Sequence, residues 1–233
     1  MRRRTGFSLM ELLVVIVVIA IVSGIVVVVA GGVLEKARLL KSSGNLRSIG
    51  VGVANYMADH NNTYPLRAKS GWSGPYWTDY VEPYLEDPVK GEWRDQNGRE
   101  YAIAPAFVDP MLDNDAHHSI GDYGAHNRIF VRGLTEEEAA AGQSLVLTRG
   151  EDIYRPSRTI MVTTAEVTSG GREIGSWFIE VSQFIPNPDN DRYARPSDRG
   201  TGNVLALFCD GHTESIPMEE LKEKRQDYFL LEP

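Results

Sequence analysis

The sequence predicts an α+β protein in which a long N-terminal helix, membrane-spanning in its first half, packs on an antiparallel β-sheet head. Residues 12–34 contain no charged side chain, and residues 35–60 place apolar side chains at helical spacing. Short β-branched segments separated by turn residues fill the second half of the chain. A composition of 42% hydrophobic and 24% charged residues is typical of globular proteins.

The apolar run is long enough to cross a bilayer. Its 23 residues would extend about 34 Å as a helix, against a hydrocarbon core of about 30 Å. So many β-branched residues favour a helix poorly in water, but in lipid only a helix satisfies the backbone of a single segment. We therefore expect a transmembrane helix here.

The second part of the helix is predicted to be amphipathic and to end near residues 58–62, where turn residues precede Pro65. Gly44, Gly50 and Gly52 weaken it. They either permit close packing or make the helix flexible, and the pattern leaves both readings open. The apolar face is formed by Leu39, Leu40, Leu46, Ile49, Val53, Tyr56 and Met57.

The charge distribution argues against a nucleic-acid partner. The net charge of −8 includes Arg2, Arg3 and Arg4 at the N-terminus, so the rest of the chain carries −11. A surface this acidic repels nucleic acid, and cation binding is easier to reconcile with it. Cys209 is the only cysteine, so the chain forms no internal disulfide.

Glu11 lies at the start of the apolar run, where a carboxylate needs a partner, a function or a place among the lipid headgroups. The basic leader, Gly6-Phe7, this glutamate and the apolar run together resemble the processing signal of type IV prepilins and type II secretion pseudopilins. The resemblance implies that prepilin peptidase cuts after Gly6 and that the new N-terminal Phe7 is N-methylated. It also implies that Glu11 pairs with the N-terminal amine of a neighbouring subunit. That amine has a pKa of about 8 and is cationic at neutral pH.

The resemblance implies a pilin-like subunit, either a pseudopilin or a minor pilin, and not an enzyme. Its expected partners are prepilin peptidase, other pilin-like subunits in a homo- or hetero-filament, an inner-membrane assembly platform and membrane lipid. The expected location is the bacterial inner membrane, with a single span and the head in the periplasm or, after assembly, on the cell surface. The predicted organisation is a leader over 1–6, a transmembrane or filament-core helix over 7–34, an amphipathic helix over 35–60 and a globular head over 61–233.

Three alternatives remain open. An ordinary signal peptide could end at Ala30, although its apolar region would be unusually long. A permanent single-pass anchor explains the length of the run but not the spacing of Gly6, Phe7 and Glu11. A membrane-anchored binding or hydrolytic domain could also use the same export signal.

The head is predicted to contain an antiparallel sheet, a terminal hairpin turning at Asp210-Gly211, and a helix after Pro217. Thr135 and Glu138 have the spacing of a capping box and open a short helix. The strand candidates are residues 128–132, 145–148, 159–165, 174–181, 203–209 and 213–216.

Three segments of the head, residues 123–127, 156–160 and 203–212, resemble a bacterial subfamily of pilin-like proteins with a C-terminal Asp-Gly-His region. Many of its members have a histidine ten residues before the Asp-Gly pair. This chain has Gly200 there, so the role of that histidine does not transfer.

The residues between 66 and 119 are rich in Trp and Tyr, and either form a local core or offer a platform for sugars or bases. His117 and His118, with aspartates nearby, are interpreted as part of a polar loop and not a metal centre.

Calcium is the better metal candidate, because Asp189, Asn190 and Asp191 offer oxygen ligands in a turn and major pseudopilins are known for calcium in a late loop. The alternative is a solvated turn.

Overall fold

The computed structural model describes residues 9–87, 90–94, 98–113 and 115–231, except for the side chains of residues 25–31. The chain divides into two compact units, Met1–Leu40 and Lys41–Pro233. Helix α1, Leu9–Asp59, contributes residues to both units. It ends where the sequence predicts, because Asn61 and Asn62 adopt left-handed backbone angles that stop a helix.

The first unit consists of the N-terminal part of α1. From Leu12 to Val22 its large apolar side chains are between 47% and 59% exposed. Within the described residues, which leave out the side chains of 25–31, no helix is long and apolar enough to cross a membrane. This finding does not confirm the span predicted over residues 12–34.

The second unit is an α+β head, as the sequence predicts. Its main sheet has the strand order β11-β10-β6-β5-β8, and β7 and β9 both pair with β6. All these pairs are antiparallel except β5 with β8. The strands of this sheet are β5 Tyr123–His126, β6 Ile160–Ser169, β7 Arg172–Gly175, β8 Phe178–Ile179, β9 Arg195–Pro196, β10 Asn203–Phe208 and β11 Thr213–Pro217.

Smaller elements surround this sheet. Two separate hairpins are formed by β1 with β2 and by β3 with β4. Their strands are β1 Ala68–Ser70, β2 Ser73–Tyr76, β3 Gly91–Arg94 and β4 Glu100–Ile103. The short helices are α2 Trp77–Val81, α3 Glu136–Ala140, α4 Val181–Phe184, α5 Met218–Glu223 and α6 Arg225–Phe229. Three 3₁₀ turns cover Glu82–Tyr84, Pro105–Phe107 and Gly150–Asp152.

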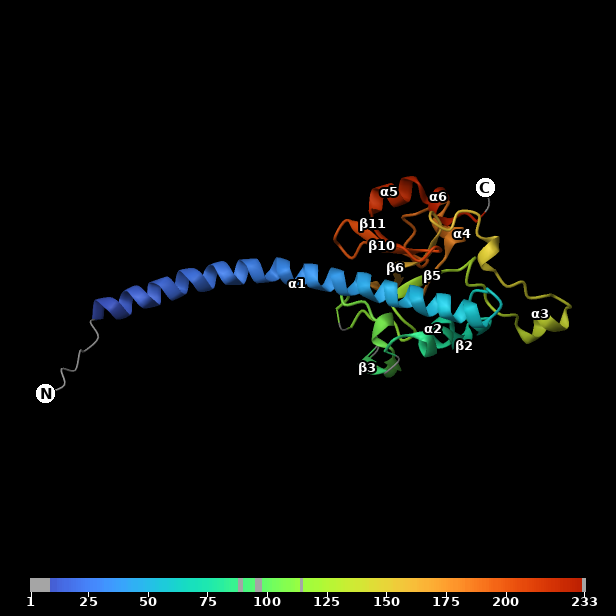
Figure 1. Cartoon of the computed structure of the whole chain (residues 1–233), viewed down its shortest axis with the longest axis horizontal. Coiled ribbons are helices and arrows are strands. Elements are labelled where there is room, and N and C mark those ends of the chain that lie inside the picture. Colours follow the sequence, from blue (N-terminus) through green and yellow to red (C-terminus); the bar gives the residue numbers. More distant parts are fainter. Residues whose placement is uncertain (1–8, 88–89, 95–97, 114, 232–233) are drawn as a thin grey trace. The chain divides into compact units, whose positions relative to one another are not determined.

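The C-terminal part of α1 is a core element of the head. Leu46, Ile49 and Val53 are at most 1% exposed. Figure 1 shows β10, β11, α5 and α6 on one side of this part of the helix and α2 on the other. A Cβ atom at Gly50 would lie 3.0 Å from Leu207 of β10, and one at Gly52 would lie 2.7 Å from Val81 of α2. These two glycines therefore permit close packing on both sides.

The predicted terminal hairpin is confirmed, with Asn203 opposite Pro217 and Leu207 opposite Thr213. Gly211 has a φ of 90°, which a side chain disfavours, and the Asp210 carboxylate accepts the backbone N–H of His212 at 3.1 Å. The His212 ring stacks on Phe208, with 4.2 Å between the ring centroids. The Asp-Gly-His residues therefore close the turn between β10 and β11.

Two strand predictions are wrong. Residues 128–132 form a turn, because the N–H groups of Ile129 and Phe130 both bond to the His126 carbonyl. Residues 145–148 contain no strand, and only Arg149 just beyond them forms an isolated bridge, with Thr63. Apolar β-branched sequences favour strands only where a partner strand is available.

A buried histidine fastens the C-terminal end of the chain. His126 accepts the Arg128 N–H at Nδ1, so its Nε2 carries the proton and donates to the Phe229 carbonyl at 3.0 Å. Complete burial lowers the pKa of His126 to about 4 and keeps the ring neutral. This bond holds α6 against β5.

The glycines of α1 provide a matched test of the packing. We expect Gly52→Ala to lower the free energy of unfolding by about 1 to 3 kcal/mol, because its methyl group would overlap buried Val81. The control Gly44→Ala has nothing within 4 Å of the added Cβ, so it should raise stability by up to about 1 kcal/mol. Denaturant titration of the full-length protein in detergent measures both, and equal effects would contradict the packing described.

Candidate functional site

The predicted processing residues Gly6 and Phe7 lie outside the described residues. Glu11 lies in the first turn of α1, where a carboxylate interacts favourably with the helix dipole. The exposed apolar surface that follows it begins at Leu12 and surrounds the helix. A helix that is apolar all round requires cover by lipid or by other protein.

The residues proposed for calcium do not form a cation site as they stand. The Asp189 carboxylate lies 2.8 Å from the Lys222 ammonium, which lowers the pKa of Asp189 and places a positive charge beside it. The Asn190 side-chain oxygen accepts the Arg192 N–H at 3.2 Å. Among the described residues, no group of three or more His, Cys, Asp or Glu side chains could hold a metal ion. Calcium at Asp189, Asn190 and Asp191 therefore stays an untested prediction with poor geometric support.

The aromatic residues of the Trp-rich segment separate into two kinds. Trp77 is completely buried and donates from Nε1 to the Trp177 carbonyl at 2.7 Å, so it belongs to the core. Trp72 is 61% exposed, with its ring beside Trp177 and Phe178. Trp93 of β3 lines a cavity. Of these tryptophans, Trp93 is the one placed beside a space that could hold a ligand.

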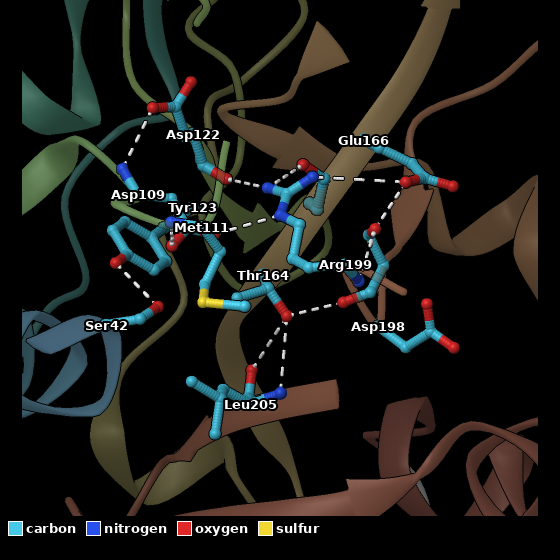
Figure 2. A network of polar contacts seen from close by, with 12 residues as sticks. Ser42, Asp109, Met111, Asp122, Tyr123, Thr164, Glu166, Asp198, Arg199 and Leu205 are labelled. Atoms are coloured by element: carbon cyan, nitrogen blue, oxygen red, sulfur yellow. Dashed lines mark hydrogen bonds and ion pairs between the residues drawn. The ribbon is translucent and has the colours of Figure 1, made fainter. Parts of the chain in front are cut away.

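A buried ionic network connects three segments of the head (Figure 2). The Arg199 side chain is 5% exposed and donates from Nε to the Asp109 carboxylate at 2.9 Å. Its Nη2 donates to the carbonyls of Asp122 at 3.1 Å and Ala165 at 2.8 Å. Burial of this many charged atoms is stable only when they are paired and hydrogen-bonded. Arg199 therefore joins the loop before β10 to the loop before β5 and to β6.

Asp122 is the second acidic residue of the network and is completely buried. It accepts N–H groups from Asp109 at 3.0 Å and from His118 at 2.9 Å, and it receives Nδ1 of His117 at 2.7 Å. Gly175 makes room for it, because a Cβ there would lie 2.2 Å from the carboxylate. Asp122 therefore organises the loop between β4 and β5.

The network also reaches α1. The hydroxyls of Ser42 and buried Tyr123 lie 2.9 Å apart, and the Asn45 side chain donates to the Val108 carbonyl at 2.9 Å. Figure 2 shows Tyr123 between Ser42 and the Asp109 segment. Polar bonds therefore hold the beginning of the head's helix to the sheet and to the loop that carries Asp109.

His117 stands between this network and the cavity. It is 3% exposed, yet it lines a cavity of 360 Å³ together with Glu92, Trp93, Arg94 and Glu100. Burial alone would lower the pKa of His117, but the bond to Asp122 and the negative charges of Asp122 and Asp109 raise it above 6.5, against the opposing charge of Arg199. The ring is therefore a buried, proton-binding group at the cavity wall.

The sequence predicts a polar loop around His117 and Asp122, and these residues do lie in a loop of polar contacts between β4 and β5, but the burial of both side chains was not predicted. The sequence did not identify Arg199 or Asp109 at all. Arg199 precedes Gly200, the position at which many subfamily members have histidine. No local pattern identifies a residue that meets its partners 34 to 90 positions away in the sequence.

The His117–Asp122 pair predicts a pH dependence of stability. Because the pKa of His117 is raised on folding, its contribution is complete below its ordinary value of 6.5 and is lost as pH rises through the folded value. The pKa of His126 is lowered on folding, so its contribution to stability does not change with pH above about 6.5. The free energy of unfolding should therefore fall as the pH rises above about 6.5.

Asp122→Asn should flatten this slope, because burial then dominates and the pKa of His117 falls. The exposed-histidine control His60→Gln should leave the slope unchanged. Denaturation at several pH values measures the slope, and NMR titration of the His117 ring measures its pKa. A folded Asp122→Asn protein with an unchanged His117 pKa would contradict the assignment.

The comparisons with known proteins concern the N-terminus. Residues 1–27 match the prokaryotic N-terminal methylation motif. No curated protein and no solved structure matches the chain significantly, and the resemblance to an Asp-Gly-His subfamily stays a prediction. The motif contains Gly6, Phe7 and Glu11, so the chain carries the N-terminal signal of type IV pilins and pseudopilins.

Proposed function

We propose that this protein is a structural filament subunit, of the pseudopilin or minor-pilin kind, that serves type II secretion or a type IV pilus. The methylation motif supports processing by prepilin peptidase and assembly with other pilin-like subunits. The observation that carries the proposal is that this motif opens a helix whose apolar side chains are exposed and whose far end is built into the head.

Processing and assembly follow from charge and burial. Cleavage after Gly6 creates an amine at Phe7 that is cationic at neutral pH. Glu11, four residues further on, is the carboxylate that this amine of a neighbouring subunit neutralises. Neither charge is stable alone among apolar helices, so their pairing sets the stagger between subunits. Before assembly, lipid of the inner membrane covers the apolar side chains of α1, and an assembly platform then transfers the subunit to the filament.

The head is joined to the C-terminal part of α1 by contacts that can transmit force. Force applied to α1 reaches the head through buried Leu46, Ile49 and Val53 and through the bonds of Ser42 and Asn45. The hydrophobic contacts and the polar bonds lie on the same helix segment, so the part of α1 after Leu40 and the sheet belong to one compact unit. We expect the exported head to be in the periplasm or, after assembly, on the cell surface.

We propose assembly and not catalysis as the task of the chain. The His117–Asp122 pair has the arrangement of a general base, but the described residues that line its cavity include no hydroxyl or thiol nucleophile. Burial raises the pKa of Cys209 to about 12, so its thiolate is scarce at neutral pH. An anchored hydrolytic domain remains the alternative, and an exported mature chain that never polymerises would favour it.

The processing prediction is tested on protein purified from membranes of a strain with active prepilin peptidase. We expect a mature chain that begins at Phe7 and carries one N-methyl group. Intact-mass and N-terminal peptide mass spectrometry measure both features, and Gly6→Leu should block cleavage as the control. A chain that begins at Gly31 or retains Met1 would refute the proposal.

The pairing of Glu11 is tested by its replacement. We expect Glu11→Ala to be cleaved normally but to reduce filament assembly by about tenfold or more, because a charge-assisted bond contributes about 1.5 to 3 kcal/mol. The control Glu35→Ala removes the carboxylate at the other end of the apolar run and should assemble normally. Assembly is measured by sedimentation of sheared filaments, and equal assembly of both variants would exclude the register role.

A further inference from the structure

We propose that the cavity beside the β3–β4 hairpin binds a neutral polyhydroxylated ligand such as a sugar ring. Its lining residues are Glu92, Trp93, Arg94, Glu100 and His117. They belong to the globular head, whereas the proposed assembly function rests on the N-terminal signal. The inference therefore goes beyond the assembly function, and each can fail without the other.

His117 is the most firmly positioned residue of this site. Its side chain is 4% exposed and its Nδ1 is held by Asp122 at 2.7 Å, so the ring cannot turn without breaking a buried bond. No described residue accepts or donates a bond at its Nε2, which belongs to the edge of the ring opposite the Asp122 contact. A nearly buried imidazole with one nitrogen fixed and the other left for the cavity is a preorganised ligand contact.

Trp93 supplies an indole surface to the cavity. Its ring meets the His117 ring edge to face, with centroids 5.9 Å apart. Its Nε1 is buried and has no partner among the described residues, and a Cβ added at Gly91 would lie 2.8 Å from it. The part of Trp93 that a ligand can contact is therefore the ring.

The charged residues of the cavity distinguish between ligand classes. Glu92 and Glu100 are acceptors, whereas Arg94 is a donor that pairs with Glu100 at 2.9 Å. With Nδ1 bonded to Asp122, the Nε2 of His117 accepts a bond when the ring is neutral and donates one when it is protonated. Sugar hydroxyls match such a mixture, because each one donates and accepts.

Other ligands fit less well. The two carboxylates repel an anion, and the arginine and the histidine oppose an organic cation. The volume of 360 Å³ lies at the small end of the range of ligand pockets. A mono- or disaccharide stacked on the indole is therefore the occupant that the chemistry selects.

The test uses the full-length protein in detergent and three neutral disaccharides, cellobiose, maltose and chitobiose, titrated by isothermal calorimetry. We expect saturable binding of at least one of them. Indole N–H resonances, observed with ¹⁵N-labelled tryptophan, should show a shift of the signal that Trp93→Phe removes. Trp93→Phe replaces the indole by a smaller aromatic ring, and should weaken binding about fivefold or more.

The matched control is Trp72→Phe, an exposed tryptophan that does not line the cavity. It should bind the disaccharide as the wild-type protein does. Far-ultraviolet circular dichroism checks that each variant is folded, and Glu100→Gln provides a second lining variant if Trp93→Phe fails to fold. The proposal is overturned if none of the three disaccharides binds saturably, if Trp72→Phe weakens binding as much as the lining variants, or if choline binds more tightly than the sugars.

Discussion

The head depends on the burial of Arg199 between Asp109 and the carbonyls of Asp122 and Ala165. An unpaired guanidinium in this position would carry a large desolvation penalty, so the surrounding segments are stable only in the arrangement that satisfies it. These segments are the loop before β5, strand β6 and the loop before β10, and they are far apart in the sequence. The positive φ of 52° at Arg199 adds a backbone cost that the same bonds offset.

The other features of the head follow from this arrangement. Asp122 fixes His117 at the cavity wall, so the network holds this side of the cavity. Tyr123, the next residue along the chain, bonds to Ser42 of α1. One buried cluster therefore serves both the attachment of the helix and the geometry of the candidate ligand site. A substitution in this cluster would affect both together.

Local patterns predicted the elements whose signals are complete in a few neighbouring residues. The Thr135 capping box forms as expected, with the Glu138 N–H bonding to the Thr135 hydroxyl at 3.2 Å. The Asp210-Gly211 turn and the end of α1 at Asp59 are equally local. The strands predicted over 128–132 and 145–148 failed because β-structure requires a partner that the segment itself does not contain. For the same reason the sequence could not distinguish the two roles of the tryptophans, because only their burial in the fold shows that Trp77 is a core residue and that Trp93 lines a cavity.

The sequence by itself determined the N-terminal methylation motif of residues 1–27, because such a signal is a linear pattern of charge, side chain and apolar length. It also determined the α+β class, through periodicities of apolar residues along the chain. Only the tertiary structure decided that Arg199, Asp109 and Asp122 form one buried network and that His117 and Trp93 share a cavity. These relations depend on distances between segments that are remote along the chain, and burial sets their energies.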